Sequence, residues 1–119
     1  MQILLVDDEA ELVSTLAERL HYRKIKADWV TSAEDALKLV QTNKYDLALL
    51  DVRMPKANGF ELKKKLQAQD PEMKFIFLTG HGSGKDHETG SLEAGESNYL
   101  IKPLNIEILL KKINDVLKK

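Results

Sequence analysis

The sequence contains no cysteine, and this absence excludes disulfides, thiolate metal sites and thiol catalysis. It also lacks a signal-peptide pattern and any apolar run near the roughly 20 residues that span a bilayer. Neither sign of charge dominates, because 18 basic and 19 acidic residues leave a net charge of −1. Bulk charge therefore predicts no contact with nucleic acid or membrane. We expect one cytoplasmic domain over residues 1–119.

Short apolar runs alternate with amphipathic stretches along the chain. The runs at 3–6, 27–30, 47–51, 74–79 and 98–101 predict five strands, and the stretches between and after them have the apolar spacing of helices. Five strands that alternate with five helices indicate an α/β fold whose parallel strands are joined by right-handed crossovers. The lysine-rich sequence before the second run predicts an edge position for that strand.

Local signals predict where several helices begin and end. Ser32 is a predicted N-cap, Asn43 a predicted end of the second helix, and Asp70–Pro71 a predicted end of the third. The final helix is expected to include Leu104. The polar segment 81–91 contains three glycines, so the fourth helix is expected to be short or of low stability. Low stability is typical of an element that moves.

Polar side chains stand at the ends of four predicted strands. Asp7 and Asp8 follow the first strand and Asp51 ends the third, which places all three at the carboxyl edge of a parallel sheet. Thr79 ends the fourth strand, and Lys102 follows the fifth at the same edge. Carboxylates held together are costly unless a cation neutralises them. The pattern predicts first a Mg²⁺ site and second a site for phosphate chemistry.

The order of these motifs resembles the receiver domain of bacterial two-component response regulators over essentially all 119 residues. The resemblance is carried by Val6–Glu9, Leu50–Pro55, Asn58–Gly59, Leu78–Gly80 and Tyr99–Pro103. It implies a flavodoxin-like, doubly wound (βα)5 fold with a five-stranded parallel sheet in the order 2-1-3-4-5. It also implies a signalling switch that is no conventional enzyme, because it catalyses only its own phosphorylation and dephosphorylation.

The resemblance implies a role for each residue of the predicted site. Asp51 would accept a phosphoryl group from a sensor histidine kinase or a phosphotransfer protein. Mg²⁺ would be bound directly by Asp8 and Asp51. The backbone carbonyl of Arg53 would be a further ligand, and Asp7 would act through water. Lys102 would supply a positive charge to a phosphoryl oxygen.

The resemblance also implies how the signal is transmitted. Phosphorylation of Asp51 would add about −1.5 to −2 charges, the Thr79 hydroxyl would donate a hydrogen bond, and Tyr99 would turn inward. The face formed by the fourth helix, fifth strand and fifth helix would then change. That face would control a downstream protein or output domain, and it is our hypothesis for a homodimer contact. Arg53 and His81 border the phosphoryl site and would tune the rate of hydrolysis.

Three other functions were weighed against the residues. A phosphatase of the haloacid dehalogenase kind also forms an aspartyl phosphate, but it needs a second Asp where this chain has Arg53. A flavodoxin-like cofactor binder would need a phosphate-binding loop after the first strand, and the acids found there would repel FMN phosphate. A degenerate receiver that acts by contacts alone is the remaining alternative. The complete set of acceptor-site residues argues against it.

Overall fold

The computed structural model describes residues 1–54, 57–79, 99–102 and 104–117, so His81 and the predicted fourth helix lie outside the described residues. A five-stranded sheet in the order β2-β1-β3-β6-β7 lies at the centre, and its strand pairs are all parallel. The strands are β1 (Gln2–Val6), β2 (Lys26–Val30), β3 (Leu47–Asp51), β6 (Lys74–Thr79) and β7 (Tyr99–Ile101). Because β6 and β7 are the fourth and fifth strands of this sheet, the expected order 2-1-3-4-5 is confirmed, with β2 at one edge.

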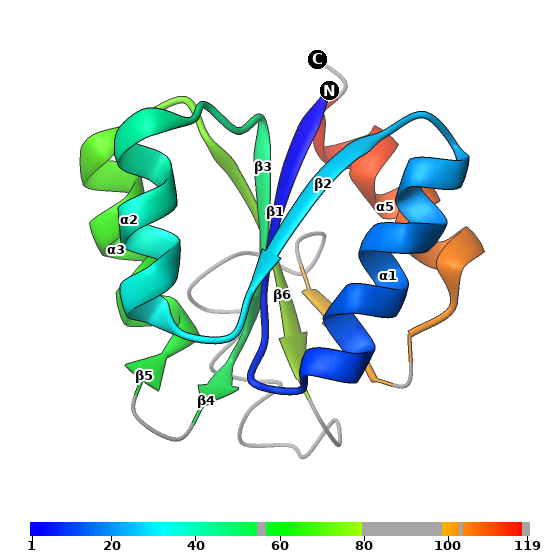
Figure 1. The fold of residues 1–119 in the computed structure, drawn as a ribbon, viewed down its shortest axis with the longest axis horizontal. Helices are drawn as coiled ribbons and strands as arrows, with labels where there is room; N and C mark the ends of the chain where they lie inside the picture. Colours follow the sequence, from blue (N-terminus) through cyan, green and yellow to red (C-terminus); the bar gives the residue numbers. More distant parts are fainter. Residues whose placement is uncertain (55–56, 80–98, 103, 118–119) are drawn as a thin grey trace.

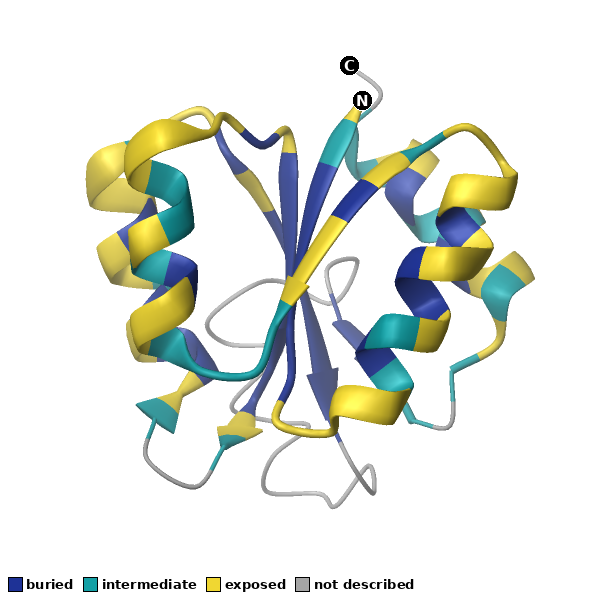
Figure 2. Ribbon diagram, in the orientation of Figure 1, coloured by how far each residue is buried: buried dark blue, intermediate teal, exposed yellow. Residues whose placement is uncertain are grey.

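Helices cover both faces of the sheet (Figure 1). One face packs against α1 (Ala10–Tyr22) and α5 (Ile106–Leu117), and the other packs against α2 (Ala33–Thr42) and α3 (Gly59–Gln69). Buried side chains of β1 alternate between the two cores, since Leu5 contributes to the first and Leu4 to the second. Burial on both faces explains why β1, β3 and β6 are largely apolar runs. Figure 2 shows exposed residues on the outer sides of the helices and along the edge strand β2.

Serine and asparagine side chains cap the N-terminal ends of α2, α3 and α5. Ser32 Oγ accepts a hydrogen bond from the Asp35 backbone N–H at 3.1 Å, as the sequence predicts for an N-cap. The expected inclusion of Leu104 in the final helix is wrong, because α5 begins at Ile106. Asn105 Oδ1 accepts the backbone N–H groups of residues 107 and 108 at 2.7 and 3.3 Å, so the chain enters the helix only after Asn105.

Two short strands that the sequence pattern did not predict follow β3. They are β4 (Arg53–Met54) and β5 (Ala57–Asn58), which pair antiparallel and lead directly into α3. They lie beside the carboxyl end of β3, so they frame one side of the edge where the predicted site residues meet (Figure 1). Within the described part of the chain, no helix has both the length and the apolar character needed to cross a membrane.

Candidate functional site

Buried polar side chains gather at the carboxyl edge of the sheet. Asp7, Asp51 and Thr79 are 0%, 4% and 1% exposed, and they are the buried polar or charged residues found within the described ranges. They come from the ends of β1, β3 and β6, which are neighbouring strands. Burial of polar groups is costly unless they are paired or bind a ligand. This edge is therefore the candidate site.

Three carboxylates at this edge are arranged to share a cation. Asp7, Asp8 and Asp51 each offer an oxygen, and these oxygens all lie within 4.8 Å of one another. Asp8 is exposed while the other two are buried, so the cluster opens to solvent on the side of Asp8. Carboxylate oxygens are the ligands that Mg²⁺ and Ca²⁺ prefer. The donor set fits a divalent ion of this kind.

Lys102 is the positive charge of the site. Its ammonium nitrogen lies 2.8 Å from Asp7 Oδ2, 2.9 Å from Glu9 Oε1 and 3.6 Å from Asp51 Oδ1. The Lys102 backbone N–H donates to the Thr79 carbonyl at 2.8 Å, which ties the end of β7 to that of β6. This position of Lys102 at the sheet edge agrees with the prediction from the sequence. The contact with Glu9 was not foreseen, although Glu9 follows Asp7 and Asp8 directly.

The proximity of the carboxylates changes their protonation. Burial raises the pKa of Asp51 to about 7; the Asp7 charge and a hydrogen bond with Asp8 act in the same direction, while Lys102 and the Arg53 backbone N–H oppose them. Burial also raises the pKa of Asp7, against its hydrogen bond with Lys102. For Lys102, burial lowers the pKa, but hydrogen bonds to Asp7 and Glu9 outweigh burial and raise it. Burial and the neighbouring carboxylate both disfavour the ionised form of Asp51, and a bound cation would oppose this effect.

Thr79 adds a hydrogen-bond donor to the site. Its Oγ1 is buried and has no hydrogen-bond partner among the residues described. A buried hydroxyl without a partner costs roughly 1–3 kcal/mol, so its presence favours a ligand oxygen as the missing partner.

Tyr99 lies beside Phe77 of β6 in the strand register and is buried on the face that packs against α2 and α3.

Gly59 holds the backbone at the end of β3. A Cβ atom at this position would lie 2.4 Å from the Asp51 carbonyl oxygen, closer than any side chain tolerates. The Gly59 N–H donates to the Val52 carbonyl at 3.0 Å, so the first turn of α3 packs directly against the end of β3. Asn58–Gly59 is one of the motifs that carry the family resemblance, and Gly59 within it allows this close backbone approach.

The sequence pattern of the response regulator receiver domain family matches residues 3–114. The chain belongs to this family. Receiver domains are the signalling domains of two-component response regulators, which interact with histidine kinases and output domains. The expected family and signalling class are thus confirmed.

Relatives match this receiver domain over nearly all of its length. It is 34% identical over 119 residues to the two-component response regulator PhoP of Pseudomonas aeruginosa, covering 100% of this chain and 52% of that protein. The chain thus spans about half the length of the curated relatives it matches. A response regulator from Clostridium difficile superposes with a TM-score of 0.87 at 28% identity, covering 100% of this chain and 97% of that one.

A third relative carries ligands. It is a response regulator from Burkholderia pseudomallei with a phosphorylated aspartic acid, a calcium ion and citrate. It superposes with a TM-score of 0.81 at 28% identity, covering 93% of this receiver domain and 65% of that chain.

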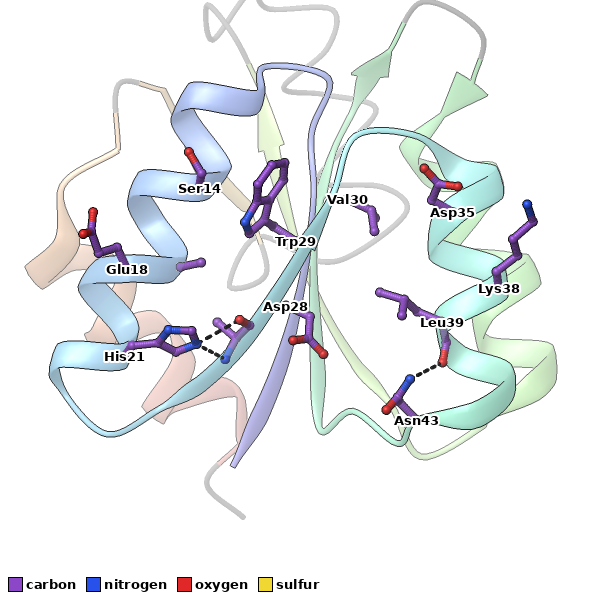
Figure 3. A pocket seen from close by; sticks show the side chains of 12 residues that line it. Ser14, Glu18, His21, Asp28, Trp29, Val30, Asp35, Lys38, Leu39 and Asn43 are labelled. Carbon is purple, nitrogen blue, oxygen red and sulfur yellow. Dashed lines mark hydrogen bonds between the residues drawn. The ribbon is translucent and has the colours of Figure 1, made fainter.

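A surface hollow on the described part of the chain lies away from this site. It has a volume of about 840 Å³ and follows the edge strand β2 between α1 and α2 (Figure 3). Two of its polar side chains have partners within the protein: Asp28 accepts from the Tyr45 hydroxyl at 2.6 Å, and His21 Nε2 lies 3.0 Å from the Ala27 carbonyl. None of the converging residues Asp7, Asp51 or Lys102 lines it. The candidate site is therefore the carboxyl edge of the sheet and not this hollow.

Proposed function

We propose that this receiver domain is a phosphoacceptor switch in which Asp51 takes a phosphoryl group from the phosphohistidine of a histidine kinase or phosphotransfer protein. The observation that carries the proposal is the meeting at one sheet edge of a buried carboxylate, an ammonium group and a buried hydroxyl that has no hydrogen-bond partner among the described residues. An Asp51 carboxylate oxygen forms a bond to phosphorus while the phosphorus–nitrogen bond breaks. The electron pair of that bond returns to the imidazole of the donor, which then takes a proton from water.

The carboxylates of the site fit Mg²⁺. Asp8 and Asp51 would bind the ion directly, the Arg53 backbone carbonyl would be a further ligand, and Asp7 would act through water. When bound, the ion would offset the negative charges of the carboxylates and the incoming phosphoryl group. The calcium ion and phosphorylated aspartic acid of the Burkholderia relative support this assignment.

Lys102 and Thr79 would stabilise the transferred phosphoryl group. Lys102 is held 3.6 Å from Asp51 Oδ1, where its charge can pair with a phosphoryl oxygen. Two unit charges at about 4 Å interact by on the order of 4 kcal/mol at an effective dielectric near 20. The Thr79 hydroxyl would donate to a second oxygen and so gain the partner that it lacks among the described residues. These groups would serve only the domain's own phosphorylation and dephosphorylation.

The output would pass through the elements that follow Thr79. A shift of the Thr79 hydroxyl toward phosphorylated Asp51 and a matching change at Tyr99 would alter the face made by the fourth helix, β7 and α5. This face would act on an output domain, a downstream protein or a second copy of the chain. Arg53 borders the site as an exposed residue and would tune hydrolysis together with His81.

Intact mass spectrometry after incubation with Mg²⁺ and acetyl phosphate tests the proposal. We expect one phosphoryl adduct on the wild-type protein and none on Asp51→Asn or on wild type in EDTA. A folded, Mg²⁺-binding protein without an adduct would instead favour the degenerate receiver that acts by contacts alone. Continuous release of phosphate from simple phosphate esters would favour the phosphatase alternative.

A further inference from the structure

Glu9 joins two segments that are far apart in the sequence. Its Oε1 lies 2.9 Å from Lys102 Nζ, across a separation of 93 residues. The Glu9 side chain is 61% exposed, while that of Lys102 is 14% exposed and that of Asp7 is fully buried. The ammonium group is therefore held between a buried carboxylate on its inner side and an exposed one on its outer side.

The backbone around Glu9 directs this side chain away from its own helix. Glu9 is the N-cap residue of α1, yet its side chain makes no capping hydrogen bond. By contrast, Ser32 and Asn58 cap α2 and α3 through their side chains. The Glu9 N–H donates to Asp7 Oδ1 at 2.9 Å, which fixes the turn between β1 and α1. The helix lacks the side-chain cap that usually stabilises it, and the Glu9 carboxylate contacts Lys102 instead.

We propose that Glu9 is a positioning residue that holds Lys102 in the unphosphorylated domain and releases it to the phosphoryl group on Asp51. The proposal rests on the phosphoacceptor function of Asp51. Lys102 donates a hydrogen bond to Glu9 Oε1 at 2.9 Å and forms an ion pair with Asp7 Oδ2 at 2.8 Å, whereas its 3.6 Å separation from Asp51 is longer than a hydrogen bond.

The difference in burial decides which of the two contacts is given up. A phosphoryl group brings about −1.5 to −2 charges and three acceptor oxygens next to Lys102. Exposed Glu9 recovers its hydration when it leaves the ammonium, while buried Asp7 has no access to water. Release of Glu9 therefore costs less than release of Asp7. Until release, Glu9 holds Lys102 back and adds negative charge at the entrance used by anionic phosphodonors.

The rate of adduct formation with acetyl phosphate at fixed Mg²⁺ tests this inference in three variants. Glu9→Gln removes the ion pair, and Glu9→Asp keeps the charge but shortens the reach by one methylene. Glu11→Gln removes an equal charge from the exposed first turn of α1 and is the matched control. We expect roughly two- to fivefold faster phosphorylation for both Glu9 variants, in line with an exposed ion pair, and no change for Glu11→Gln.

Two outcomes would overturn the inference. Equal rates for Glu9→Gln and Glu11→Gln would show that the contact does not restrain Lys102. A fast Glu9→Gln with a wild-type rate for Glu9→Asp would show that charge alone acts, without tethering.

Nitrogen-15 NMR of the Lys102 ammonium group, without Mg²⁺ or phosphodonor, tests the contact separately. We expect a slowly exchanging signal in wild type that is weakened in both Glu9 variants; an unchanged signal would overturn the contact. The absence of any wild-type adduct would overturn the phosphoacceptor function and the release step, whatever the NMR signal shows.

Discussion

At the scale of single residues, Asp51 is subject to two opposing effects. Its proposed role as a nucleophile needs the carboxylate, but burial and the charge of Asp7 raise its pKa to about 7. Protons and Mg²⁺ therefore compete for the site near neutral pH. We expect Mg²⁺ affinity to rise between about pH 6 and pH 8 as Asp51 loses its proton. Calorimetric titration at both pH values checks this, and Asp51→Asn should show a much weaker pH dependence.

The raised pKa of Asp51 also predicts how stability depends on pH. The folded-state pKa of about 7 lies above the ordinary 3.8, so the folded protein binds the extra proton between these values. The stability that this proton contributes is complete below about pH 3.8 and lost by about pH 7.

In EDTA at about pH 8, we therefore expect Asp51→Asn to raise the free energy of unfolding by roughly 1–3 kcal/mol, with little effect near pH 4. Urea unfolding measures the free energy of unfolding at both pH values. A less stable Asp51→Asn at the higher pH would mean that attraction to Lys102 exceeds the cost of burial.

The Thr79 hydroxyl gives a second prediction at this scale. Val has nearly the shape of Thr without the hydroxyl, and Thr79 Oγ1 is buried with no hydrogen-bond partner among the described residues. We expect Thr79→Val to stabilise the unphosphorylated protein by about 1 kcal/mol, while Thr79→Ser, which keeps the hydroxyl, does not. Thermal unfolding measures the difference. Loss of stability in Thr79→Val would show that the hydroxyl already has a partner.

At the scale of elements, the contact between α3 and β3 is sensitive to a single methyl group. Gly59→Ala would place Cβ 2.4 Å from the Asp51 carbonyl oxygen, so β3 or α3 must move. We expect this overpacking to cost about 1–3 kcal/mol of stability and to weaken Mg²⁺ binding several-fold. Ala68→Gly, at an exposed position on the same helix, is the control and should cost about 1 kcal/mol without affecting Mg²⁺. Equal Mg²⁺ affinity in both variants would contradict the prediction.

Burial on both faces made β1, β3 and β6 predictable, because each is a largely apolar run that ends at or just before a polar residue; the edge strand β2, with three of its five residues exposed, lacks this pattern. The paired strands β4 and β5 have two residues each, too few to show any periodicity. Asn105 was missed as a cap because Leu104 before it continues the apolar spacing of α5. The convergence of Asp7 and Asp51 followed from topology alone. The direction of the Glu9 side chain did not, since it depends on a residue 93 positions away.

At the scale of the whole molecule, β7 connects the two cores. Tyr99 packs in the core on the α2 and α3 side, whereas the next residue, Leu100, packs in the core on the α1 and α5 side. Phe60 and Phe77 lie with ring centroids 4.7 Å apart in the core that contains Tyr99. A displacement of β7 would therefore disturb both layers, and it would move the exposed face of β7 and α5. Coupling of this kind would give a local event at Asp51 a global readout.

That exposed face is apolar enough to test for self-association. Ile101 of β7 and Ile108 of α5 are 47% and 56% exposed, and we expect them to be covered when the domain is phosphorylated. Analytical ultracentrifugation with Mg²⁺ and beryllofluoride, which mimics a phosphoryl group, should then show dimers. Ile108→Lys should remain monomeric although it still forms the acetyl phosphate adduct. Trp29→Lys, which changes an apolar residue 40% exposed on the edge strand β2, is the matched control and should dimerise normally.

If the wild-type protein stays monomeric with and without beryllofluoride, the result would argue that the switch acts on a different protein. The same face would remain the candidate contact, because Ile101 and Ile108 are large apolar side chains exposed on it. Crosslinking to an output partner, reduced in Ile108→Lys and unchanged in Trp29→Lys, would then separate a heterologous contact from self-association. Dimers that persist in Ile108→Lys would instead exclude this face and require that the signal from Asp51 leave the molecule elsewhere.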